Sequence, residues 1–141
     1  MKKMISIVML LTMVFMSVNV CYAAVETGTA SPRYVSVAYY NNTFDIQDSG
    51  MACYELTISP NPQILPDKVT ATVKIVNADT ERSVYTKTQT MSYSSITRKF
   101  TAADSKQLTA RGEYEMSVTY KCYNGSTLLE TITAPLQTAM Y

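Results

Sequence analysis

The sequence has no histidine and no tryptophan, and it contains only four glycines and three cysteines. Without histidine it lacks Ser-His and Cys-His nucleophile pairs, imidazole-bound zinc and the commonest general base. The isolated glycines form no phosphate-binding loop, and three cysteines are too few for a four-thiolate metal site. We therefore expect a protein that is not an enzyme and that binds no cofactor and no metal.

Clustered positive charge is also missing. The chain has 12 Lys and Arg against 11 Asp and Glu, and beyond residue 23 only Arg98 and Lys99 are adjacent. Proteins that bind nucleic acids carry a concentrated basic surface. We expect no nucleic-acid partner and, for the same reason, no simple electrostatic adhesion to anionic membranes.

The long apolar run lies at the N-terminus. Lys2 and Lys3 precede the apolar segment 5–16 (ISIVMLLTMVFM), and a more polar stretch follows it. Signal peptidases require small residues at positions −3 and −1, so Cys21 and Ala23 predict cleavage between Ala23 and Ala24. We expect residues 1–23 to be a signal peptide and the mature protein to be secreted, without stable membrane insertion after cleavage.

Two other interpretations of this N-terminus were weighed. An uncleaved anchor needs about 20 apolar residues, more than this run provides. A lipoprotein would carry its lipid on Cys21, but the preceding Val18-Asn19-Val20 lacks the usual small residues. The mass of the mature protein distinguishes the three cases.

Tyr, Val, Ile and Thr dominate the rest of the chain, and these residues favour β-strands. Residues 24–32 are small and polar, which predicts a flexible leader before a single domain at 33–141. A single helical turn is expected at 102–107, and Pro135 is expected to end the fold. The predicted strands cover residues 34–40 with a possible continuation at 43–47, 51–59, 68–77, 83–91, 93–100, 113–123 and 126–134.

Period-two alternation assigns the faces of these strands. Ala52, Tyr54, Leu56 and Ile58 share one face of the second strand. The predicted core of the strands at 68–77 and 113–123 consists of Val69, Ala71, Val73, Ile75, Tyr114, Met116, Val118 and Tyr120.

The last hairpin contains the turn sequence Asn124-Gly125. A two-residue loop pairs Tyr120 with Leu129 and turns Leu128 and Ile132 outward. A three-residue loop, 123–125, pairs Tyr120 with Leu128 and keeps Ile132 inside. Because a register error moves every side chain to the other face, we predict the three-residue loop.

Seven to eight short strands with turns between them predict an antiparallel sandwich. Residues 110–116 (ARGEYEM) resemble the D-x-G-x-Y-x-C segment that opens strand F of immunoglobulin-type domains. The resemblance implies that Tyr114 is a tyrosine-corner residue. Ala110 replaces the acid and Met116 replaces the cysteine, so the chain resembles an immunoglobulin-like sandwich in the broad sense.

The whole chain resembles small secreted immunoglobulin-like proteins of unknown function from Gram-positive, clostridia-like bacteria. The similarity lies in the Lys-Lys-Met start, the Tyr-rich segment 34–40, and the segments 49–53 (SGMAC) and 112–114 (GEY). It implies a bacterial, extracellular domain and no particular activity.

Cys53 and Cys122 are the two cysteines beyond the signal peptide. An even number in an exported chain predicts a disulfide between them, and immunoglobulin-type domains join strands B and F in this way. Cys53 is out of phase with Tyr54 and Leu56, so the bridge requires a bulge. Two free thiols are the alternative.

Other candidate sites are weaker. Glu113 and Glu115 flank Tyr114 as a possible carboxylate pair, but two solvated charges on an outer face are favoured. Asp45 and Asp48 could ligate calcium, but the full ligand spacing is absent and turn chemistry is favoured.

The many tyrosines suit both strands and binding surfaces, and we favour the structural role. We expect a secreted, non-enzymatic binding module for an unknown extracellular protein or glycan. The alternative is a secreted inhibitor or toxin-like effector that acts on another protein.

Overall fold

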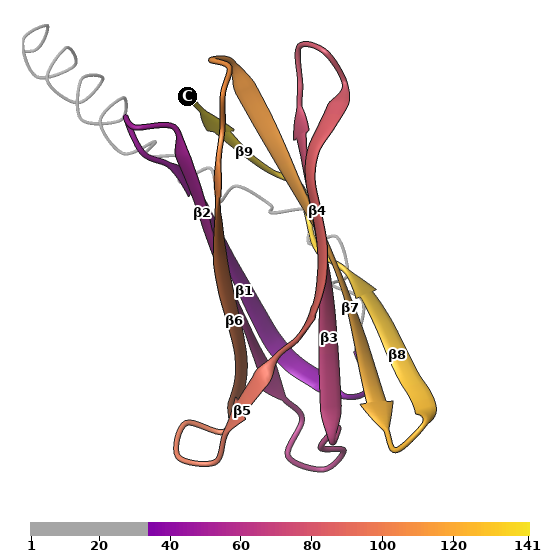
Figure 1. Cartoon of the computed structure of the whole chain (residues 1–141). Helices are drawn as coiled ribbons and strands as arrows, with labels where there is room; N and C mark the ends of the chain where they lie inside the picture. The colour runs from indigo at the N-terminus through magenta and orange to yellow at the C-terminus, as the bar shows by residue number, and fades with distance from the viewer. Residues whose placement is uncertain (1–33) are drawn as a thin grey trace, which may run out of the picture. The chain divides into compact units, whose positions relative to one another are not determined.

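Nine β-strands make up residues 34–141, the part of the chain that the computed structural model describes (Figure 1). The predicted signal peptide at 1–23, the cleavage position between Ala23 and Ala24, and the leader at 24–32 lie outside these residues. None of the described residues belongs to a helix long and apolar enough to cross a membrane. The strands are β1 Val37–Ile46, β2 Met51–Pro60, β3 Lys68–Asn77, β4 Arg82–Thr90, β5 Ser92–Ser94, β6 Lys99–Gln107, β7 Glu113–Asn124, β8 Thr127–Thr133 and β9 Gln137–Met140.

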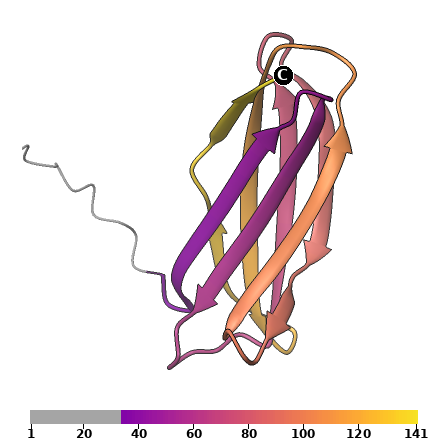
Figure 2. The same cartoon turned by 90° about the vertical axis from the view of Figure 1, so that its left-hand side faces the viewer.

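The strands form two antiparallel sheets that pack face to face. One sheet has the order β1-β2-β6-β5, which faces the viewer in Figure 2. The other has the order β4-β3-β7-β8, with β9 paired to the first half of β7 and β8 to the second half. The chain crosses between the sheets after β2, β4 and β6. The predicted all-β antiparallel sandwich is therefore confirmed.

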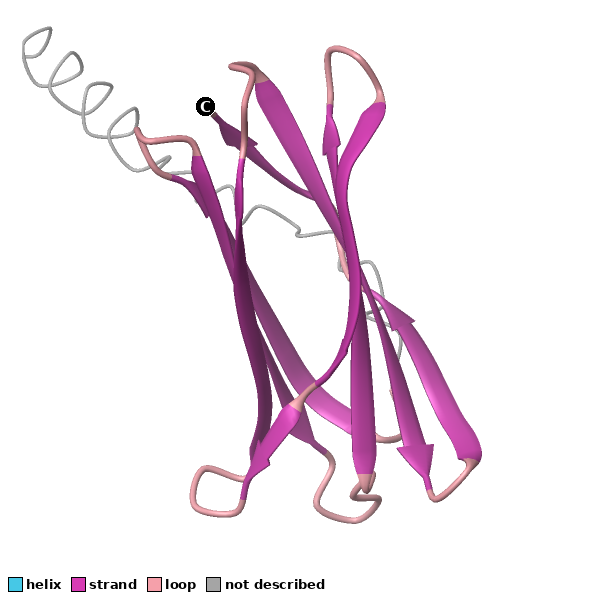
Figure 3. Ribbon diagram, viewed as in Figure 1, coloured by secondary structure: helices cyan, strands magenta, loops and turns pink. Residues whose placement is uncertain are grey.

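The strand directions give the sandwich two distinct ends (Figure 3). The lower end, as seen in Figure 1, carries the loops 61–67, 95–98 and 125–126, which follow β2, β5 and β7. The upper end carries the loops 47–50, 78–81 and 108–112 and the C-terminal residue.

The core lies between the sheets, on the faces that the alternation predicted. All eight predicted core residues from β3 and β7 are buried, and so are the four from β2. Burial of such side chains stabilises the fold by about 1.5–3 kcal/mol each. The core is completed by Val37, Met91, Phe100, Leu108, Cys122, Ile132 and Ala134.

Four local predictions are wrong. Residues 93–100 do not form one strand, because the turn 95–98 separates β5 from β6. Residues 102–107 continue β6, because they pair with Met51–Leu56 of β2 instead of forming a helical turn. The Asn41-Asn42 pair does not end the first strand; Asn42 is buried and its Oδ1 accepts a hydrogen bond from the Tyr120 hydroxyl. The fold also continues past Pro135, because β9 pairs with β7.

The last hairpin has neither of the two registers considered. Asn124 pairs with Thr127 across a two-residue turn, in which Gly125 has a φ of 59°. A bulge then leaves Leu129 as an extra residue on β8, and Tyr120 pairs with Ile132. The bulge changes the phase of the strand, which is how Ile132 faces the core although the turn is short.

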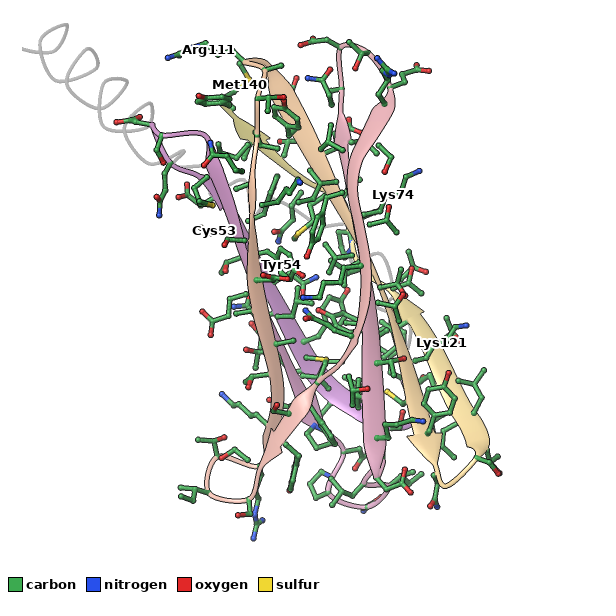
Figure 4. All side chains as sticks on the ribbon, in the orientation of Figure 1. Cys53, Tyr54, Lys74, Arg111, Lys121 and Met140 are labelled. Carbon is green, nitrogen blue, oxygen red and sulfur yellow. The ribbon has the colours of Figure 1, made fainter. Side chains whose placement is uncertain are left out.

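The predicted disulfide is also wrong, because Cys53 and Cys122 are both free. β2 and β7 both start at the upper end and run in the same direction, whereas the bridge required them to be antiparallel. Cys53 therefore lies near the upper end, paired with Asp45, on the outer face of its sheet (Figure 4). Cys122 is buried, paired with Val69 near the lower end.

Candidate functional site

The loop 61–67 is stiffened by prolines and by local hydrogen bonds. Pro60 is the last residue of β2, and Pro62 and Pro66 restrict the backbone of the loop that follows. The Asn61 side-chain Oδ1 accepts a hydrogen bond from the Gln63 N–H (3.0 Å), and the Asn61 carbonyl accepts one from the Ile64 N–H (3.1 Å). The resulting turn leaves Ile64 and Leu65 pointing away from the core, with Leu65 50% exposed.

The loop 95–98 is a tight turn with an apolar tip. The Ser94 hydroxyl accepts a hydrogen bond from the Thr97 N–H (3.3 Å), and Arg98 closes the turn with a φ of 54°. Ile96 lies at the tip and is 94% exposed, more than any other large apolar side chain in residues 34–141.

Hydrogen bonds join the loop 61–67 to the β7–β8 turn. The Asp67 N–H donates to the Tyr123 carbonyl (3.0 Å), and the Asp67 carboxylate accepts from the Gly125 N–H (2.6 Å). The Lys68 ammonium also lies 4.7 Å from the centre of the Tyr123 ring. The two loops therefore hold a fixed relative position.

Exposed apolar side chains concentrate at this end. Seven of the ten exposed large apolar residues within 34–141 lie on its loops, just before β1, in β5 or at the start of β8, and an eighth, Tyr39, lies near the start of β1. Exposed apolar side chains gathered at one end of a soluble domain are typical of interaction surfaces. We name this set the lower-end surface, and it consists of Val35, Ile64, Leu65, Tyr93, Ile96, Leu128 and Leu129.

A groove of about 480 Å³ lies between the loops 61–67 and 95–98. Its walls are mostly apolar, and it contains one cation, Arg98, together with three hydroxyl groups. The groove thus combines an apolar lining with hydrogen-bond donors for an anionic group. It is lined by Ser59, Pro60, Pro62, Leu65, Tyr93, Thr97 and Arg98.

Positive charge gathers at the same end. Lys68, Arg98 and Lys99 lie in or beside its loops, and the one acid there, Asp67, is hydrogen-bonded to Gly125. Within residues 34–141 the only ion pair joins Lys87 and Asp104, so these three cations have no carboxylate partner. The fold brings together charges that are scattered in the sequence.

A second polar cluster lies between the two ends, where β4 faces β6. Tyr85 donates a hydrogen bond to the Asp104 carboxylate (2.8 Å), which also binds the Lys87 ammonium, and the Tyr54 and Tyr85 hydroxyls are 3.3 Å apart. Figure 4 shows Tyr54 between the sheets.

The hydrogen bonds from Lys87 and Tyr85 lower the pKa of Asp104 to about 2. Desolvation, followed by hydrogen bonds to Tyr54 and Asp104, raises the pKa of Tyr85. Neither group exchanges a proton near neutral pH, so the cluster is suited to joining the sheets and not to acid–base chemistry.

The opposite edge is closed in a similar way. The Tyr120 hydroxyl donates to Asn42, and the Gln137 side chain donates to the Asn42 carbonyl (2.7 Å). Burial raises the pKa of Tyr120.

The Glu130 carboxylate accepts hydrogen bonds from the Val35 and Ser36 N–H groups (both 3.0 Å) and fixes the start of the first sheet. These tyrosines and acids serve the structure.

The predicted carboxylates lie in two separate places, and Glu113 and Glu115 flank the buried Tyr114 as the alternation predicted. Glu113 and Glu115 lie on β7 at the upper end, and Glu115 pairs with Val76 and Thr138 in the sheet. Asp45 lies in β1 and Asp48 in the following turn. In the described residues no three Cys, Asp or Glu side chains form a group that could hold a metal ion.

The lower-end surface was not predicted from the sequence. The signal for it lies in Ile64, Leu65 and Ile96, which are aliphatic residues in loops otherwise made of Ser, Thr, Pro and polar residues. No family model, curated protein or solved structure matches this chain. The surface is therefore interpreted from its own chemistry.

Proposed function

We propose that the chain is a secreted, non-enzymatic binding module of the immunoglobulin-like type, and that it binds an extracellular partner through the lower-end surface. One observation carries the proposal: most of the exposed large apolar side chains within 34–141 are gathered at one end of the sandwich. Export rests on the N-terminal sequence, in which a basic start and an apolar run precede the small residues Cys21 and Ala23.

The strand order supports the immunoglobulin-like assignment. β1-β2-β6-β5 corresponds to A-B-E-D, and β4-β3-β7-β8 corresponds to C′-C-F-G. The Tyr114 hydroxyl donates to the Ala110 carbonyl (2.7 Å), as a tyrosine-corner residue does near the start of strand F. In sandwiches of this type the recognition loops cluster at the ends.

Cell binding tests the proposal. The secreted protein, purified and fluorescently labelled, is incubated with intact cells of the organism that encodes it. We expect saturable binding that is strongly reduced by combining Ile96→Ser with Leu65→Ser. Met140→Ser is the matched control, because Met140 is an exposed apolar residue at the upper end (69% exposed). Equal binding by the loop variant and the control would contradict the proposal.

A further inference from the structure

We infer that the partner of the lower-end surface is a lipid bilayer with anionic headgroups, on which the domain docks peripherally through its loops 61–67 and 95–98. The inference rests on the proposed function of this end and names its partner. It differs from the expectation drawn from the sequence, because it depends on charges that only the fold brings together.

The shape of the surface favours lipid over a folded protein. Ile96 is 94% exposed at the tip of a tight turn, and Ile64 and Leu65 project from the neighbouring loop. A protein partner must offer a matching pocket for each protruding side chain, whereas acyl chains and headgroups surround a protruding tip without one. Aliphatic tips flanked by Tyr and by basic residues are typical of interfacial membrane binding.

The cations lie where phosphate groups would meet them. Arg98 and Lys99 follow Ile96 by two and three residues, and Lys68 follows Leu65 by three. With the aliphatic tips at the acyl boundary, these cations are level with the headgroups. Asp67 is the one acid beside them, and its carboxylate accepts a hydrogen bond from the Gly125 N–H.

The groove between the two loops suits one anionic headgroup. Arg98 offers a planar set of donors that matches phosphate oxygens, and Ser59 and Thr97 add hydroxyl groups. The apolar walls formed by Leu65 and Tyr93 would contact the upper part of the acyl chains.

The charge of the two ends orients the domain. The upper loops and the residues next to them carry Asp48, Asp79, Glu81 and Glu113 against Arg82 and Arg111. The lower loops and their neighbours carry Lys68, Arg98 and Lys99 against Asp67. An anionic surface therefore attracts the lower end and repels the upper end.

Vesicle co-sedimentation tests the inference. The secreted protein is mixed with vesicles of phosphatidylcholine alone, or of equal parts phosphatidylcholine and phosphatidylglycerol. We expect binding to the anionic vesicles that weakens as salt is added. Each cation near the surface changes the partition coefficient about fivefold, so Arg98→Gln with Lys99→Gln should lower it by about 25-fold. Ile96→Ser should also lower it, whereas Arg111→Gln and Met140→Ser at the upper end should not.

Thermal unfolding of each variant confirms that it is folded. Equal partitioning into the neutral and anionic vesicles, or equal loss from variants at the two ends, would overturn the lipid assignment. If no vesicle is bound but Ile96→Ser with Leu65→Ser still abolishes cell binding, the lipid assignment fails and the proposed binding function stands with a protein or glycan partner. If the wild-type protein binds neither vesicles nor cells, the lipid assignment and the proposed binding function are both refuted.

Discussion

The two ends of the sandwich consist of similar loops, but the side chains of these loops make different contacts. At the upper end the loops close on one another. The Asn77 side chain accepts hydrogen bonds from the Thr80 N–H (2.9 Å) and hydroxyl (2.8 Å), Gly112 exchanges two backbone hydrogen bonds with Tyr141, and Arg111 stacks on the Tyr141 ring. Asn77, Arg111 and Tyr141 are thus used in contacts within the domain, whereas Met140 is exposed.

At the lower end the hydrogen bonds fix the bases of the loops and leave the tips free. Asp67 and Asn61 hold the backbone, while Ile96 and Leu65 face outward. One end stabilises the fold, and the other presents a rigid apolar surface, for which binding costs little ordering entropy.

The largest expected difference between the ends comes from their glycines. Gly112 has a φ of 140°, and a Cβ at this position would lie 2.6 Å from the Asp79 carboxylate; Gly125 has a φ of 59° and no atom within 4 Å of a Cβ. Gly112→Ala should lower the free energy of unfolding by about 2–3 kcal/mol, and Gly125→Ala by about 1 kcal/mol. Urea denaturation measures both. Equal losses would show that the upper end is not the more tightly closed.

The next largest difference in stability should come from removing a tyrosine hydroxyl group at each end. Tyr114→Phe removes the hydrogen bond to the Ala110 carbonyl and should cost about 1–1.5 kcal/mol of stability. Tyr93→Phe is the matched control, since the Tyr93 hydroxyl makes no hydrogen bond within residues 34–141 and should change stability by less than about 0.5 kcal/mol. Chemical denaturation compares the two. A Tyr114→Phe protein as stable as the control would mean that the corner does not hold the upper loops.

The sequence predicted the core of this fold well because its signal is local. Val69 to Ile75 and Tyr114 to Tyr120 alternate with polar residues, and the alternation alone assigns their faces. The same alternation extends to Cys122, which is buried on that face of its strand.

Features that depend on long-range pairing were missed. β9 has only four residues and is defined by its pairing with β7, and the polar segment 102–107 extends because β2 lies beside it. The disulfide failed for a similar reason, since the relative direction of β2 and β7 follows from the topology. The lower-end charges were missed because Lys68 and Arg98 are far apart in the sequence.

The cluster between the ends should respond to acid. Because the pKa of Asp104 is lowered to about 2, its ionised form stabilises the fold above about pH 4, and this contribution is lost as the pH falls toward 2. Asp104→Asn should therefore cost about 1 kcal/mol at neutral pH and nothing at the acid limit. Asp48→Asn, in an upper-end turn, is the control. Denaturation at several pH values checks this, and a constant difference between Asp104→Asn and wild type would refute it.

The smallest effect on stability is expected at the lower-end tip, where the effect on binding should be large. Ile96 is 94% exposed and contributes little to the core, so Ile96→Ser should change the free energy of unfolding by less than about 0.5 kcal/mol. Ile58→Ser, in the buried part of β2, should instead cost several kcal/mol, about 3 or more. Chemical denaturation measures both changes. The Ile96→Ser curve should have the same slope as the wild-type curve and lie close to it, whereas the Ile58→Ser curve should shift to lower denaturant. A loss above about 1 kcal/mol at Ile96 would mean that the tip is covered in solution, and the contrast between the two ends would no longer hold.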